Sequence, residues 1–297
     1  MNHLITDNTC LLHYVPNVMN TVQGELSLYD KIAPHLEMAE QWLTTHFLSE
    51  VVLEDLFSAD ESNKLLHYAR MATTAEALLH AVPSLDLILT PNGFGIVNNA
   101  NLVPASKERM ERLLLSLEKT RDDALQVLLP LLSEHAAWKG TAPCDFFAST
   151  LYPWLDLPHR LGQSDHLWQS FQSLHEKQRA IEEHLAHDFF SCELMEVLRQ
   201  GALFSNWNDT ASAPQYKSAW QHILAIVLFM LREEDPKPPL PSCIEVVNVI
   251  RSTPDGVFDE WKQSVTASLF ENHGFINKKS SGAFGSENKK LSLQANQ

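Results

Sequence analysis

Apolar residues recur every three or four positions along most of the chain, which is the spacing of one buried face on an α-helix. The longest patterns predict helices at 27–47, 62–82, 103–132, 164–200 and 215–232, and shorter ones predict helices at 242–252 and 256–272. The fold class predicted from this periodicity is mainly α, a helical bundle with long helices.

Polar and small residues mark several of the expected helix ends. Ser27 and Ser164 can cap N-termini, because a serine hydroxyl accepts a hydrogen bond from the first turn of a helix. Gly201 suits the C-terminal end of the helix that begins at 164. That helix would span about 54 Å at 1.5 Å per residue, longer than a compact core requires. Pro34 either kinks the first helix or forms its true first turn, and the 215–232 helix is predicted to be buried.

One segment departs from the helical spacing. Between residues 85 and 97, apolar residues fall in two short runs separated by Pro91-Asn92-Gly93, which suits a tight turn. We therefore expect a β-hairpin at about 85–98, embedded among helices. The dipeptide Phe94-Gly95 reappears as Phe284-Gly285 after another predicted helix. This repeat has two explanations. Either an internal duplication has produced a second hairpin near the C-terminus, or two short segments match by chance.

Helix-breaking residues divide the chain. Glycine and proline recur through residues 138–163, which indicates a domain boundary or a long connection. The predicted organisation is an N-terminal arm (1–26), a helical subdomain with the hairpin (27–137), a connection (138–163), a second helical subdomain (164–272) and a basic flexible tail (273–297).

Composition is that of a globular protein, with 44% hydrophobic and 20% charged residues. The longest strongly apolar segment, 223–231, is shorter than the roughly 20 residues of a membrane span, so no membrane role is expected. The N-terminus lacks a secretory pattern, which favours the cytoplasm of the producing cell. The four cysteines are scattered without a C-x-x-C pair, and free thiols are the simplest interpretation.

The formal net charge is −15, which argues against specific nucleic-acid recognition because that needs clustered Lys and Arg. The charge is uneven. From His273 onward four lysines face one acid, so the tail carries +3 and the rest of the chain −18. Such a tail is either a solvated terminus or an arm that orders on an acidic neighbour.

Charged positions on the predicted helices are expected to face solvent. Those between 107 and 123 alternate in sign, as i,i+4 ion pairs on an exposed face require; they are Lys107, Glu108, Arg109, Glu111, Arg112, Glu118, Lys119, Arg121, Asp122 and Asp123. Glu176, Glu182 and Glu183 are likewise interpreted as surface residues.

His184 and His187 form the best local metal candidate, with acids and a thiol nearby in the sequence at Glu183, Asp188 and Cys192. These histidines fall on the polar face of their helix, however, so solvated side chains are the preferred interpretation. Motifs for a catalytic nucleophile or a phosphate-binding loop are missing from the sequence. We therefore expect neither a cofactor nor an enzymatic activity.

Aromatic residues point instead to protein contacts. Seven tryptophans exceed what a core usually needs, and Trp154 and Trp207 lie in expected loops, where they serve either as interface anchors or as lids over the local core. The candidate interaction residues are Pro91, Asn92, Gly93, Phe94, Trp154, Trp207, Lys278 and Lys279.

Several motifs resemble a family of uncharacterised proteins encoded by phages and prophages of gut Bacteroidales. They are Tyr14-Val-Pro-Asn, Gly24-Glu-Leu-Ser-Leu-Tyr-Asp-Lys-Ile, Ala39-Glu-Gln-Trp-Leu, the segment 83–97, and Pro104-Ala-Ser-Lys-Glu-Arg. The resemblance is specific over about residues 14–125 and much looser after 140.

The resemblance implies a virion structural protein, most plausibly a head-completion or head–tail connector (adaptor) subunit that forms a ring in the host cytoplasm. Its expected partners are copies of itself, the portal, and neck or tail proteins. Two alternatives stay open. One is another neck, tail-completion or capsid-accessory protein; the other is a helical metal-binding protein or enzyme using His184 and His187.

Overall fold

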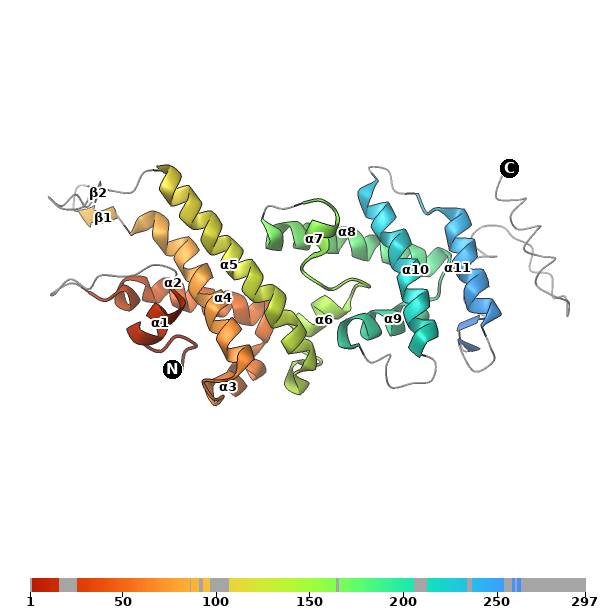
Figure 1. Cartoon of the computed structure of the whole chain (residues 1–297), viewed down its shortest axis with the longest axis horizontal. Coiled ribbons are helices and arrows are strands. Elements are labelled where there is room, and N and C mark those ends of the chain that lie inside the picture. Colours follow the sequence, from red (N-terminus) through yellow and green to blue (C-terminus); the bar gives the residue numbers. More distant parts are fainter. Residues whose placement is uncertain are drawn as a thin grey trace, which may run out of the picture. The chain divides into compact units, whose positions relative to one another are not determined.

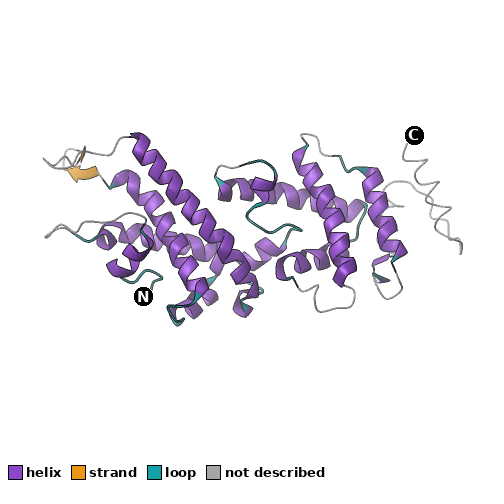
Figure 2. Cartoon of the chain, viewed as in Figure 1, coloured by secondary structure: helices purple, strands orange, loops and turns teal. Residues whose placement is uncertain are grey.

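The computed structural model describes residues 2–15, 26–85, 87–90, 93–96, 107–163, 166–205, 213–233, 237–253, 258–259 and 261–262. The described chain is mainly helical, as the periodicity predicts (Figures 1 and 2). It separates into two compact units, residues 1–145 and 146–297. None of the described helices has the length and apolar character needed to cross a bilayer.

Unit 1 is built around a pair of long helices. α4 (Lys64–Ala81) packs most extensively against α5 (Lys107–Glu134) and also against α2 (Leu28–Leu43). The shorter elements of unit 1 are α1 (Asn8–Tyr14), a π-helical turn (Thr44–Leu48), α3 (Glu50–Phe57), two 3₁₀ turns (Val82–Ser84 and Ala136–Trp138) and α6 (Ala142–Ala148), whose last residues belong to unit 2.

Polar side chains start the helices of unit 1, because the first backbone N–H groups of a helix have no partner within it. Ser27 caps α2 as predicted, with its hydroxyl accepting from the Asp30 N–H at 3.1 Å. Asn63 caps α4 in the same way through Leu66. Pro34 lies inside α2, so it does not form the first turn.

The first predicted helix does not continue to residue 47. It ends at Leu43, and the chain forms the π-helical turn before Ser49 takes a backbone φ of 74°. Phe47 stays fully buried, and its carbonyl accepts from the indole Nε1 of Trp138 at 2.6 Å. This tertiary bond fixes the turn where helical periodicity alone predicts a continuous helix.

Residues 2–15, which the sequence assigns to an N-terminal arm, are part of the core instead. Leu4, Ile5 and Leu11 are buried. The backbone of Leu4 is held from both sides, because its N–H donates to Glu40 at 2.6 Å and its carbonyl accepts from Arg70 Nε at 2.8 Å. Residues 16–25 lie outside the described part of the chain.

Two four-residue strands follow α4 in the chain. β1 (Leu87–Thr90) and β2 (Gly93–Ile96) pair antiparallel, with Leu87 opposite Ile96 and Thr90 opposite Gly93. The hairpin expected over 85–98 includes a turn at Pro91 and Asn92, which are outside the described residues, so the complete hairpin stays a prediction. The expected C-terminal hairpin and tail are also outside them.

Unit 2 contains α7 (Leu157–Arg160), α8 (Leu167–Asp188), α9 (Cys192–Phe204), α10 (Ala213–Arg232) and α11 (Leu240–Ser252). The division between the units falls in the predicted connection 138–163, which includes α6 and α7 and contains both buried and exposed residues. α11 begins at Leu240, two residues before the start of the helix predicted at 242–252.

The prediction of a single continuous helix at 164–200 is wrong. The helix ends at Asp188, after which Phe189 and Phe190 are both buried and Ser191 adopts an extended backbone. The Ser191 hydroxyl then caps α9 by accepting from Leu194 N–H at 3.1 Å. Gly201 does not end the helix either. It lies inside α9, which ends at Phe204 before Ser205 turns left-handed with φ 52°.

Candidate interaction surfaces

The predicted interaction residues do not form one cluster within the described chain. Gly93 and Phe94 lie on β2, opposite Thr90 and Leu89. Trp154 is half-buried in the segment before α7. The remaining five, Pro91, Asn92, Trp207, Lys278 and Lys279, lie outside the described residues.

β1 and β2 form a two-stranded sheet. Among the described elements, each strand therefore has one edge that pairs with no other strand. The backbone N–H and C=O groups along such an edge can accept a further strand from another chain. This pair of edges is the first candidate interaction surface.

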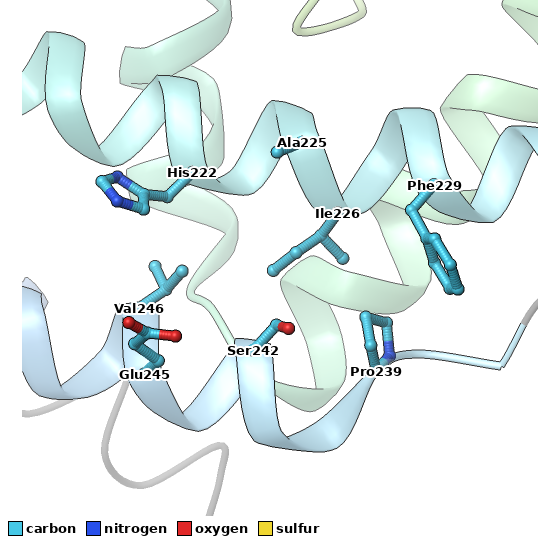
Figure 3. Close-up of a pocket in the computed structure, with 8 residues that line it drawn as sticks. All are labelled: His222, Ala225, Ile226, Phe229, Pro239, Ser242, Glu245 and Val246. Carbon is cyan, nitrogen blue, oxygen red and sulfur yellow. The ribbon is translucent and has the colours of Figure 1, made fainter.

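A groove between α10 and α11 is the second candidate surface. It has a volume of about 320 Å³, and Figure 3 shows its lining; the lining residues are His222, Ala225, Ile226, Phe229, Pro239, Ser242, Glu245 and Val246. The two helices run in opposite directions, so His222 lies opposite Glu245 and Val246 while Phe229 lies opposite Pro239.

The groove exposes one large apolar side chain, because Phe229 in its lining is 48% exposed. The prediction that the 215–232 helix is buried is therefore wrong for this face. Behind the groove Cys243 is fully buried, and burial raises the pKa of its thiol to about 12, which makes it inert.

A polar pocket of about 420 Å³ lies in unit 1 between the N-terminal segment and the loop before α4. Arg70 lies in its wall, with both terminal guanidinium nitrogens bound to the carboxylate of Glu61. Glu61 is highly exposed, and this bond lowers the pKa of its carboxyl. The guanidinium is thus already paired, and its third contact, to the Leu4 carbonyl, has a structural role.

Two charged positions predicted on the solvent face of α5 are buried. Arg121 donates to Glu76 of α4 at 2.9 Å and to its neighbour Asp122 at 2.8 Å. Burial raises the pKa of the Asp122 carboxyl, an effect that Arg121 opposes. The exposed-face prediction holds for other pairs on α5, such as Lys119 with Asp123 at 3.0 Å.

Glu182 is also not at the surface, as the sequence suggests, but completely buried in unit 2. Its carboxylate accepts from Leu151 N–H and Gln178 Nε2, each at 2.7 Å, and from Arg199 Nε at 2.9 Å. All three donors to this carboxylate come from the protein itself, so the hydrogen bonds join α8, α9 and the segment before α7. The Glu182 carboxylate therefore has a structural role and is not accessible to a ligand.

A serine and a histidine meet in unit 2, but not as a nucleophile and its base. Ser149 Oγ lies 3.2 Å from His175 Nε2, while both atoms lie within hydrogen-bond distance of the Phe146 carbonyl, at 2.7 and 3.0 Å. A carbonyl can only accept, so Nε2 carries a proton here and cannot take one from the serine.

His184 and His187 remain on the outside of α8. Both contact Asp188, at 3.5 and 3.0 Å, and both are substantially exposed. Within the described residues, no group of three or more His, Cys, Asp or Glu side chains has an arrangement suited to a metal ion.

The sequence alone does not reveal the α10–α11 groove. Phe229 falls in an apolar run that resembles a core helix, and only the placement of α11 shows which side stays open. A partial signal exists, since every position from 223 to 231 is apolar, which is more than one buried face of a helix needs.

Comparison with known proteins adds one result. No curated protein and no solved structure matches the chain. Residues 21–148, from just before α2 to the end of α6, match the model of a family of unknown function (DUF6712).

Proposed function

We propose that the protein is a structural subunit of a phage virion, a head–tail connector or head-completion subunit that assembles into an oligomeric ring. The proposal is supported by the resemblance of residues 14–125 to phage and prophage proteins. That region lies entirely within unit 1 and overlaps the family match at 21–148.

The strand edges of β1 and β2 are the observation that carries this proposal. An isolated two-stranded sheet is marginally stable in water, and pairing with a neighbouring strand adds backbone hydrogen bonds. In a ring each subunit contacts its two neighbours through different surfaces. A strand edge on one subunit and an extended segment of the next subunit would satisfy this requirement.

The net charge of −15 is compatible with the same role. A ring between capsid and tail surrounds passing DNA, and a negatively charged wall repels phosphate groups and prevents adhesion. The partners in this proposal are further copies of the chain, the portal, and neck or tail proteins.

Mass measurement in solution tests the proposal. The full-length protein is examined by light scattering and electron microscopy, alone and with the portal protein of the same phage, and purified particles are examined by mass spectrometry. Rings of defined stoichiometry are expected.

Other outcomes have distinct meanings. Presence in particles without ring formation would favour another neck, tail-completion or capsid-accessory role. A protein that stays monomeric with portal, is absent from particles and binds stoichiometric zinc or iron would overturn the virion proposal altogether.

A further inference from the structure

The guanidinium group of Arg70 has a fixed orientation in the wall of the polar pocket of unit 1. Its Nε donates to the Leu4 carbonyl at 2.8 Å, and the backbone of Leu4 is itself held by Glu40. The Arg70 side chain is only 11% exposed. Because Nε is already occupied, the two terminal nitrogens of the guanidinium remain to bind one carboxylate side by side.

The carboxylate that fills this position belongs to a side chain that is mostly in solvent. Glu61 binds both terminal nitrogens of Arg70, yet its own side chain is 78% exposed. An ion pair with so exposed a partner contributes little free energy, because water solvates the carboxylate almost as well when the pair is open. Another carboxylate can therefore replace Glu61 at small cost, provided that Arg70 stays paired.

The turn that carries Glu61 does not depend on this ion pair. The turn connects α3 to α4, and the Asp60 carboxylate closes it by accepting from the Ser62 N–H at 2.9 Å and the Ser62 hydroxyl at 2.6 Å. The Asn63 N–H donates to the Asp60 carbonyl at 2.8 Å, and the Asn63 side chain caps α4. Glu61 can thus leave Arg70 by rotation of its side chain while the backbone of the turn stays in place.

The pocket beside Arg70 has room for more than a carboxylate group. Its volume of about 420 Å³ lies within the usual range of small-molecule sites. Arg70 and Glu61 supply the only Lys, Arg, Asp or Glu side chains among the described residues that line it. The large apolar side chains of its lining on α3 and α4 are Leu56, Phe57 and Leu66, and its neutral polar groups and imidazole come from Asn2, His3, Thr6 and Tyr29. Once Glu61 moves out, the pocket combines one cation with apolar surface, which matches an organic anion.

We propose that this pocket binds a small organic carboxylate, whose carboxylate group displaces Glu61 from Arg70 and whose apolar body packs against the leucine and phenylalanine side chains of α3 and α4. Glu61 acts as an internal competitor that occupies Arg70 when the ligand is absent. Arg70 stays paired in both states, which avoids the cost of a buried guanidinium without an anion. This inference concerns the pocket of unit 1 alone and does not depend on the proposed virion role.

Binding of benzoate to the full-length protein tests the ligand class. Benzoate joins a carboxylate to a compact apolar body, benzamide is the neutral molecule of the same shape, and inorganic phosphate is an anion without an apolar body. Backbone amide shifts measured by NMR locate the site and give the affinity. Benzoate should shift amides within 2–6, 56–61 and 66–70, and it should bind at least about tenfold more tightly than benzamide or phosphate.

A pair of variants tests the exchange with Glu61. Glu61→Ala removes the internal competitor and should tighten benzoate binding by up to about fivefold, the contribution of one exposed ion pair. Glu54→Ala removes another exposed carboxylate, on α3 but outside the pocket lining, and should leave the affinity unchanged. Equal benzoate affinity in Glu61→Ala and the original protein, equally tight binding of benzamide or phosphate, or benzoate shifts confined to other regions would each overturn the proposal.

Discussion

Arg199 on α9 donates from Nε to the fully buried Oε2 of Glu182 on α8, over 2.9 Å. The two residues flank the break between these helices, and the other Glu182 oxygen holds Leu151 N–H. Burial raises the pKa of the Glu182 carboxyl, and Arg199 opposes this effect most strongly. The pair therefore joins three segments of unit 2 at a site without solvent.

Removing the arginine should strongly destabilise unit 2. Arg199→Met leaves a buried carboxylate without its cation, which typically costs about 3–5 kcal/mol of unfolding free energy. Urea unfolding followed by circular dichroism measures this. The exposed Arg179–Glu183 pair on α8 provides the control, and Arg179→Met should change stability by less than about 1 kcal/mol.

A double variant separates charge from packing. Glu182→Gln with Arg199→Met keeps an oxygen for Leu151 N–H and removes the unpaired charge, so it should recover most of the loss. A double variant no more stable than Arg199→Met alone would show that the arginine acts mainly by packing.

Periodicity predicts the helices well because it records which face of a helix is apolar. It fails for Arg121 and Glu182, since their buried positions depend on partners far away in the sequence, Glu76 and Arg199. The same limit applies to the helix predicted at 164–200. Phe189 continues the apolar stripe of α8, but Phe190 beside it is also buried, which one face of a continuous helix does not allow.

The same contrast between local and long-range signals applies to the two candidate interaction surfaces. Strand-period spacing at 87–97 is local and visible in the sequence, whereas the groove depends on two helices separated by a proline-rich segment. Local signals predict elements, and surfaces formed by two elements require the fold.

His175 should make stability depend on pH. Burial lowers its pKa below the ordinary value of 6.5, against the opposing bond to the Phe146 carbonyl. The folded protein then binds fewer protons than the unfolded chain below pH 6.5, so stability is full above that pH and falls as pH decreases toward the lowered pKa. The limiting slope is about 1.4 kcal/mol per pH unit.

Urea unfolding between pH 7.5 and 5 measures this dependence. In His175→Gln the slope between pH 6.5 and 5 should decrease by up to about 1.4 kcal/mol per unit relative to the original protein. An unchanged slope would mean that other groups dominate the titration.

Gly93→Val should weaken assembly more than folding. The substitution lies at the first position of β2, outside the helical core of unit 1, so the melting temperature should change by only a few degrees while ring formation decreases. Light scattering and thermal unfolding of the same preparation compare the two. Equal losses would assign the strand pair to the core.

Removal of residues 274–297 should leave a folded protein. The deletion removes only the basic tail, whose composition does not favour a packed core. Thermal unfolding should stay within a few degrees of the full chain. A drop of many degrees would place part of the tail in the core.

The division of the chain between residues 145 and 146 has an evolutionary consequence. The match to the family model ends at 148, within three residues of that division, so it covers most of unit 1 and almost none of unit 2. Selection can then preserve unit 1 while unit 2 is exchanged or diverges. We expect other proteins with this region to carry different sequences after α6, and recombination points to cluster there.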